Sequence, residues 1–210
     1  MKASRSSTSP TEPPVPTGNT YDKYASGNVV ERKLMSGFFT ALDASLPTRA
    51  PARVLEVGVG EGEVTGRLAR RWPDAGFVGL DLPDQDLASH WADRRFSPLF
   101  GDIVRLPFPD DSFDLVLAIE VLEHVPYPEL ALAEIERVAR HHVLLSVPRE
   151  PVWCAANMAR GKYLSDLGNT PGHINHWRKK AFTDLVGRRF DVTGVRSPFP
   201  WTVVAAQVRT

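Results

Sequence analysis

Residues 53–63, RVLEVGVGEGE, decide the fold of this chain. Residues 53–57 are typical of a strand buried on both faces, because apolar side chains run along it with little interruption. Gly58 and Gly60 then allow a sharp backbone turn and the close approach of a ligand. From Val64 on, apolar residues recur at every fourth position, which indicates an amphipathic helix. The N–H groups at the start of this helix would point into the crevice where a nucleotide-like ligand binds.

The glycine spacing separates two kinds of nucleotide site. The dinucleotide fingerprint is G-x-G-x-x-G, whereas here the third glycine is Gly62 and the spacing is G-x-G-x-G. A carboxylate at the strand exit, Glu56, would repel a pyrophosphate but suits the ammonium or sulfonium of S-adenosylmethionine (SAM). The turn resembles the first motif of class I SAM-dependent methyltransferases, which implies that Gly58, Gly60 and Glu61 contact the cofactor. The alternative is a glycine-rich connection that binds nothing.

Two further acids follow the next two predicted strands. Asp81 lies about twenty residues past the glycine turn, where a carboxylate accepts hydrogen bonds from both ribose hydroxyls, although it could instead cap the next segment. We expect the neighbouring Leu82 to line the same site. In class I methyltransferases an acid after the third strand binds the adenine amino group and the next apolar residue packs on the ring. The resemblance implies that Asp102 binds the adenine amino group and that Ile103 packs on the ring.

The most specific family signal is the run LPFPDDSFDLV at residues 106–116. It resembles the small-molecule branch that includes the ubiquinone and menaquinone methyltransferases, and resemblance of this quality covers residues 54–147. The segments YDKYASGN (21–28) and GKYLSDLGNTPGHINHW (161–177) are similar to O-methyltransferases of methylmannose polysaccharide synthesis. The resemblance implies that Tyr24 closes over the cofactor, with ordinary packing as the alternative.

Predicted strands alternate with predicted helices along the chain, which requires a parallel sheet covered on both faces. A closing strand pair joined by residues 197–201 would add one antiparallel strand. The sequence therefore predicts an α/β fold, with a single Rossmann-like class I methyltransferase domain of seven strands. We expect this domain to span residues 21–210 after a disordered tail at 1–20, with a substrate-covering insertion at 148–178. The predicted strands are 54–57, 77–81, 97–100, 113–119, 142–147, 190–195 and 203–208, and three of the predicted helices are 29–46, 87–94 and 179–186.

A possible catalytic group follows the fourth predicted strand. In a helical turn, Glu120, Glu123 and His124 would fall at i, i+3 and i+4 and project from one face. Two carboxylates and an imidazole suit Mg²⁺ or Mn²⁺. The same E-x-x-E-H run binds a divalent cation in some ubiquinone-pathway O-methyltransferases and in small-RNA 2′-O-methyltransferases. The small-RNA enzymes complete the site with a distant histidine. In this chain, His173 or His176 would supply that histidine. The alternatives are acids that stabilise a helix start and histidines bonded to backbone. Glu120 has a second candidate role, shaping the pocket near the amino acid part of SAM.

The predicted group suggests a mechanism for an alcohol acceptor. Transfer from a sulfonium is an in-line displacement, so the protein mainly aligns acceptor, methyl group and sulfur. A hydroxyl must also lose a proton, which a divalent cation promotes and which His124 or a histidine of the insertion would receive. This logic favours a vicinal diol, and we expect Mg²⁺-assisted methylation of a sugar hydroxyl. The open alternatives are O- or C-methylation of a quinone or phenol and a non-catalytic SAM-binding regulatory subunit.

Composition narrows the partners and the location. The 25 basic and 25 acidic residues balance, so no net field attracts nucleic acid or an anionic membrane. Cys154 is the only cysteine, which fits a reducing cytoplasm. The sequence shows neither a membrane-spanning apolar run nor a secretory leader. We expect a cytoplasmic protein with a small-molecule or oligosaccharide acceptor and no nucleic-acid or membrane partner, with a homodimer left open.

Overall fold

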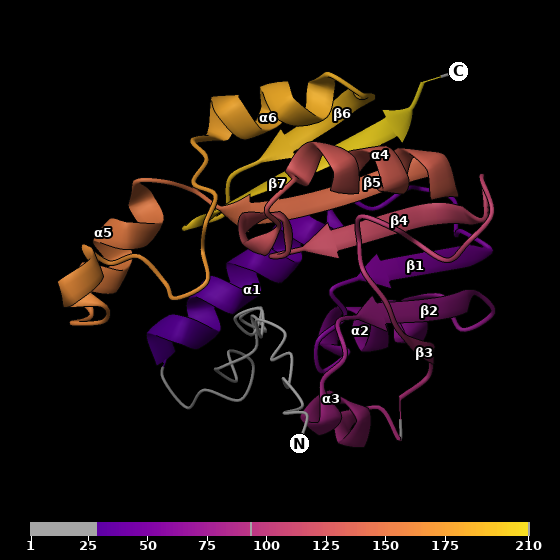
Figure 1. Cartoon of the computed structure of the whole chain (residues 1–210), viewed down its shortest axis with the longest axis horizontal. Helices are drawn as coiled ribbons and strands as arrows, with labels where there is room; N and C mark the ends of the chain where they lie inside the picture. Colours follow the sequence, from indigo (N-terminus) through magenta and orange to yellow (C-terminus); the bar gives the residue numbers. More distant parts are fainter. Residues whose placement is uncertain (1–28, 93, 210) are drawn as a thin grey trace, which may run out of the picture.

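The computed structural model describes residues 29–92 and 94–209. Within them lies a seven-stranded sheet in the order β3-β2-β1-β4-β5-β7-β6 (Figure 1). β7 is antiparallel to β5 and β6, and the other pairs are parallel. The strands are β1 Arg53–Val57, β2 Gly76–Asp81, β3 Ser97–Phe100, β4 Phe113–Ile119, β5 Ala139–Pro148, β6 Phe190–Arg196 and β7 Trp201–Val208. This confirms the predicted fold class, including the single antiparallel strand.

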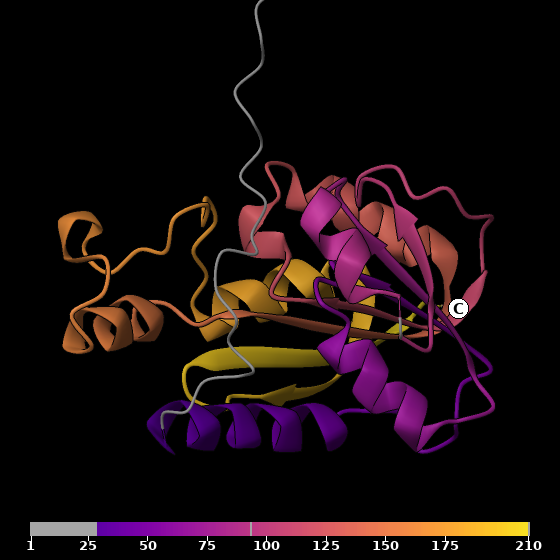
Figure 2. The same cartoon turned by 90° about the horizontal axis from the view of Figure 1, so that it is seen from below.

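Helices cover both faces of the sheet (Figure 2). α4 and α6 pack on one face through residues such as Ile135 and Phe182, and α1 and α2 pack on the other through residues such as Phe38 and Leu68. The central strand β4 is buried from both sides, which explains its nearly continuous apolar sequence. The α-helices are α1 Val29–Asp43, α2 Glu63–Arg71, α3 Gln85–His90, α4 Pro128–Val138, α5 Val152–Ala159 and α6 Lys179–Gly187, and two short 3₁₀ turns are η1 Leu122–His124 and η2 Leu164–Asp166.

The strand order places the candidate site. The chain moves outward from β1 to β2 and β3 and then returns to β4 on the other side of β1, so the order reverses between β1 and β4. In open α/β sheets a ligand binds beyond the carboxyl ends of the strands at such a reversal. The glycine turn after β1 and the acidic segment after β4 both lie at this point.

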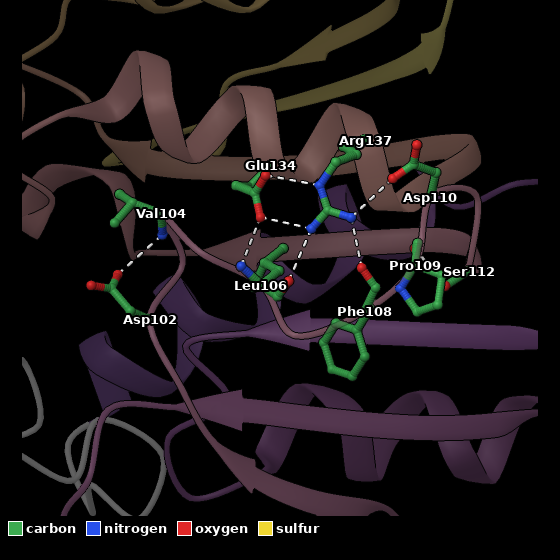
Figure 3. A network of polar contacts seen from close by, with 9 residues as sticks. All are labelled: Asp102, Val104, Leu106, Phe108, Pro109, Asp110, Ser112, Glu134 and Arg137. Atoms are coloured by element: carbon green, nitrogen blue, oxygen red, sulfur yellow. Dashed lines mark hydrogen bonds and ion pairs between the residues drawn. The ribbon is translucent and has the colours of Figure 1, made fainter.

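Arg137 of α4 gives the run at residues 106–116 a structural role (Figure 3). Its guanidinium donates to the carbonyls of Leu106 at 2.9 Å and Phe108 at 2.6 Å, and it pairs with Asp110 at 3.1 Å. It also pairs with Glu134 at 2.7 Å, and hydrogen bonds from Arg137 lower the pKa of that carboxyl group. Because Glu134 also accepts from Leu106 N at 2.8 Å, the loop before β4 is held to α4 at several points.

Several element boundaries differ from the sequence expectations, and one helix was missed. α1 ends at Asp43 instead of residue 46. α3 begins earlier than expected because Asp84 caps it, accepting from Asp86 N at 2.8 Å, and it ends at His90. The insertion contains a helix, α5, which the irregular sequence pattern did not reveal, and in Figure 1 it extends beyond the end of the sheet.

The expected disordered tail, residues 1–20, and Tyr24 lie outside the described residues. Within residues 29–92 and 94–209, no helix combines the length and apolar character that crossing a bilayer requires.

Candidate active site

The turn after β1 needs glycine for steric reasons. Gly58 has φ +72°, and a side chain there would collide with Val121, which follows β4. The backbone N–H groups of Gly58 and Val59 donate to Leu80 O at 2.7 and 3.1 Å, which ties the turn to the end of β2. Gly60 also has a positive φ, +50°. The predicted cofactor turn is therefore a fixed loop between the ends of three neighbouring strands.

Asp81 lies against this turn. Its Oδ2 accepts from Gly60 N at 2.7 Å and its Oδ1 accepts from Leu82 N at 2.8 Å. Burial raises the pKa of Asp81, although these two hydrogen bonds act in the opposite direction. Each oxygen has a second lone pair, so the predicted bonds from ribose hydroxyls remain possible. Trp91 Nε1 donates to Gly60 O at 2.8 Å, a support that the sequence analysis missed because Trp91 lies far from the turn in the chain.

Glu56 is a buried group, only 2% exposed, and accepts a hydrogen bond from Thr65 Oγ1. Burial raises the pKa of Glu56 to about 8. At neutral pH its carboxyl group is therefore mostly protonated, whereas the sequence analysis treated it as a carboxylate. Thr65 was missed, although its place in the first turn of the helix after the glycines was a usable signal.

The residues predicted at the adenine end differ in accessibility. Asp102 is exposed, and its Oδ1 accepts from Val104 N at 3.0 Å. Ile103 is 6% exposed and belongs to the core cluster on the α4 face, so it offers little surface to an aromatic ring. Glu61 is half-buried after the glycine turn. These cofactor roles remain predictions.

Three candidate metal ligands converge beyond the carboxyl end of β4. One ligand atom each of Glu123, His124 and His173 lie within 4.8 Å of one another. Glu123 and His124 come from η1, and His173 comes from the insertion. Glu123 is 1% exposed and His173 is 6% exposed. A carboxylate and two imidazoles at this spacing fit one divalent cation.

The hydrogen bond of His124 selects a tautomer. Nδ1 lies 2.9 Å from Gly172 O. Because a carbonyl oxygen can only accept, Nδ1 carries the proton, and in the neutral ring the lone pair is on Nε2. Hydrogen bonding of the other ring nitrogen to a carbonyl is the usual arrangement of a metal-ligating histidine.

The prediction that Glu120 shares one helical face with Glu123 and His124 was wrong. Glu120 has φ +59°, and η1 begins only at Leu122. Its Oε1 accepts from Ser146 Oγ at 3.0 Å and its Oε2 accepts from Trp201 Nε1 at 2.7 Å. A left-handed residue interrupts the helical spacing on which the prediction rested.

Of the two histidines proposed to complete the group, the structure brings His173 to it and not His176. His176 Nδ1 lies 3.6 Å from Glu150 Oε1. Cys154 Sγ donates to the same oxygen at 3.2 Å, and burial raises the pKa of this thiol to about 11. Such a thiol is a poor nucleophile at neutral pH.

Part of the chain is similar to known methyltransferases. Residues 55–147 match the family described as "Methyltransferase domain". A malonyl-[acyl-carrier protein] O-methyltransferase of Herminiimonas arsenicoxydans is 34% identical over 111 residues, 51% of this chain and 42% of that protein. A ubiquinone/menaquinone biosynthesis C-methyltransferase of Dinoroseobacter shibae is 36% identical over 102 residues, 45% of this chain and 41% of that protein. The chain spans less than half the length of these curated relatives.

Solved structures share the fold. A SAM-dependent methyltransferase from Mesorhizobium loti aligns with a TM-score of 0.65 and 21% identity, covering 81% of this chain and 97% of that one. A protein from Pyrococcus horikoshii aligns with a TM-score of 0.67 and 16% identity, covering 87% of this chain and 93% of that one.

Proposed function

We propose that this chain, which carries a class I SAM-dependent methyltransferase domain, transfers the methyl group of SAM to a sugar hydroxyl with the help of a divalent cation. The observation that carries the proposal is the meeting of Glu123, His124 and His173 beyond the end of β4, beside the glycine turn. Two segments far apart in the chain form this group, which a simple helix start would not require.

The donor set bears on the choice of metal. With Glu120 outside the group, the set is one carboxylate and two imidazoles instead of the oxygen-rich set expected from the sequence. Mg²⁺ prefers oxygen ligands, whereas Mn²⁺ also accepts imidazole, so Mn²⁺ fits these residues better. When bound, the cation would lower the pKa of an acceptor hydroxyl that coordinates it.

The protein's own part is mainly alignment. The glycine turn and Asp81 would hold the nucleoside, and the acceptor oxygen would approach the methyl carbon opposite the sulfur. As the new C–O bond forms and the C–S bond breaks, the hydroxyl proton must leave. Without a cation, His124 is the candidate acceptor for that proton, because its Nδ1–H is bonded to Gly172 O and the lone pair is on Nε2. With a cation bound to Nε2, that lone pair would be occupied and the proton would pass to water.

The acceptor class rests on chemistry and resemblance. Two neighbouring hydroxyls can chelate one cation, which favours a vicinal diol. The similarity of residues 161–177 to methylmannose polysaccharide enzymes favours the 1-hydroxyl of a 3-O-methylated mannoside. We further propose a cytoplasmic location and no nucleic-acid or membrane partner, with a homodimer left open. A second candidate, O- or C-methylation of a quinone or phenol, is favoured by the ubiquinone/menaquinone relative. A third is a SAM-binding regulatory subunit without activity of its own.

An acceptor screen with labelled SAM tests these alternatives. Methylated mannosides and catechols would be offered to the whole chain after EDTA treatment, with and without added Mn²⁺ or Mg²⁺. We expect a mannoside to be labelled only when a cation is added. Labelling of phenols or quinones alone would favour the second candidate. Labelling that survives EDTA treatment would contradict the proposed role of the cation in the reaction. Stimulation of a separate methyltransferase, without labelling by this chain, would favour the regulatory role.

A further inference from the structure

We propose that Thr170 is a positioning residue whose hydroxyl fixes the loop at residues 168–175 on helix α5 and thereby sets His173 against His124. The inference rests on the proposed cation site, to which it adds a support outside the ligands. It also gives the insertion a second role beyond covering the substrate, since α5 becomes the base on which one ligand is held.

Thr170 connects α5 to His173 in two steps. Its Oγ1 accepts hydrogen bonds from two side chains of α5, Trp153 Nε1 at 2.9 Å and Asn157 Nδ2 at 3.2 Å. Its carbonyl accepts from His173 N at 3.0 Å. Trp153 and Asn157 are buried, with 7% and 2% exposure. A buried N–H donor without an acceptor costs free energy, so removing the Thr170 hydroxyl would take an acceptor from two buried side chains.

The loop lies directly on the backbone of α5. Gly168 has φ +82°, and a side chain there would collide with the backbone of Cys154. Asn157 Nδ2 also donates to Gly168 O at 2.9 Å. Asn157 therefore binds the loop at two points, which leaves the segment between them little freedom to shift along the helix.

The ring of His173 lies between two aromatic neighbours. Its centroid is 5.8 Å from that of Trp153, with the planes 30° apart, and 4.8 Å from that of His124, with the planes 79° apart. Trp153 thus contacts the imidazole directly and also holds Thr170, so the loop and the ring are supported by the same side chain.

The other end of the loop is attached to η1. The backbone N–H groups of Ile174 and Asn175 donate to Glu123 O at 2.9 and 3.0 Å. Asn175 Nδ2 donates to Leu122 O at 3.0 Å and to Val125 O at 2.7 Å. Since one end of the loop is fixed to α5 and the other to η1, the hydroxyl of Thr170 controls how α5 places His173 relative to Glu123.

The test compares Thr170→Val with Thr170→Ser in the full chain. Valine has a similar shape but no acceptor, whereas serine keeps the hydroxyl. Thr183→Val is the matched control, because Thr183 is half-buried on α6, outside the loop, and its Oγ1 donates within the helix to Lys179 O at 2.9 Å. Mn²⁺ binding would be measured by electron paramagnetic resonance, and S-adenosylhomocysteine binding by calorimetry.

We expect Thr170→Val to weaken Mn²⁺ binding by about 10–100-fold, as loss of a support behind a metal ligand does. Thr170→Ser and Thr183→Val should bind Mn²⁺ like the wild type, and all three should retain S-adenosylhomocysteine binding. Equal Mn²⁺ affinity in Thr170→Val and the wild type would overturn the inference and leave the cation site standing. If Thr170→Val fails to fold, Trp153→Phe, which removes one N–H donor and keeps a ring, should cause a smaller loss in the same direction; no loss would again overturn the inference.

A second readout separates the two proposals. If the wild type binds neither Mn²⁺ nor Mg²⁺, the cation function fails, and the positioning role is then read from the imidazole resonances of His173 by NMR. Thr170→Val should shift those resonances and leave those of His90, on α3, unchanged. Unchanged His173 resonances would show that Thr170 does not place this side chain.

Discussion

Trp201 Nε1 donates a hydrogen bond of 2.7 Å to Glu120 Oε2, which holds this carboxylate toward β7. Ser146 Oγ donates to the other oxygen at 3.0 Å. Trp201 also packs on Phe38 of α1, with the ring centroids 5.0 Å apart, so Glu120 is tied to the sheet and to the face that α1 covers. The candidate cation ligand in the same short segment is Glu123, whose neighbours are His124 and His173. Two acids three residues apart thus have different surroundings.

Substitution of these two acids should separate their roles. We expect Glu123→Gln to weaken Mn²⁺ binding by at least about tenfold, because a neutral amide is a poorer ligand than a carboxylate. Glu120→Gln should keep Mn²⁺ binding near the wild-type value, since its side chain lies outside the ligand group. Electron paramagnetic resonance of Mn²⁺ checks both. Equal losses in the two variants would mean that Glu120 also serves the cation.

The glycine turn provides a pair of matched Gly→Ala changes. Gly58→Ala should destabilise the fold by about 1–3 kcal/mol and weaken SAM binding, because φ is +72° and the new methyl group meets Val121. Gly37→Ala, in the middle of α1, should be neutral or stabilising by up to about 1 kcal/mol, since no atom beyond the neighbouring helix backbone lies within 4 Å of its Cβ position. Denaturant unfolding and calorimetry with SAM measure both effects. A Gly58→Ala protein with wild-type SAM affinity would count against the turn as the cofactor site.

The fold was predictable where local pattern and burial agree. β4, residues 113–119, was predicted with its observed bounds, because a strand covered on both faces reads as one apolar run. The antiparallel β7 also followed from the order of elements. α5 was missed because its stabilising contacts, such as the bond from Trp153 to Thr170, are made with a loop later in the chain. Propensity alone does not encode such contacts.

The candidate site was predictable in its residue types and less so in its geometry. The sequence indicated Glu123, His124 and a distant histidine, and the structure brings His173 to the group. The sequence analysis misplaced Glu120, because a glutamate gives no local signal for a positive φ. The end of the surrounding sheet imposes this backbone conformation. The sequence analysis also treated Glu56 as charged, since burial depends on the packing of α2 over β1 and not on local sequence.

The hydrogen bonds and ion pairs by which Arg137 holds the loop before β4 to α4, here called the Arg137 clamp, should contribute to stability without affecting the cation site. Arg137→Met should lower the free energy of unfolding by about 1–3 kcal/mol, because it removes donors from the carbonyls of Leu106 and Phe108 and leaves Glu134 without its ion-pair partner. Lys180→Met is the control. Its ion pair with Asp184 is highly exposed, so a change within about 0.5 kcal/mol is expected. Urea unfolding measures both, and an Arg137→Met protein as stable as the control would contradict the clamp.

Glu56 should make stability depend on pH in a defined direction. Its folded-state pKa of about 8 lies above the ordinary value of 4.5, so the folded protein holds a proton that the unfolded chain releases. This contribution to stability is fully present below about pH 4.5 and is lost as the pH rises through about 8. The free energy of unfolding should therefore fall by up to about 1.4 kcal/mol per pH unit between these values.

Glu56→Gln isolates this effect, because glutamine does not titrate and its amide oxygen can still accept from Thr65. Urea unfolding of both proteins from pH 5 to about pH 9 should show a steeper decline for the wild type, so that the variant becomes relatively more stable as the pH rises. Parallel stability curves would show that Glu56 is ionised in the folded protein. In that case the carboxylate would be available to a cationic cofactor from the outset, as the sequence first indicated.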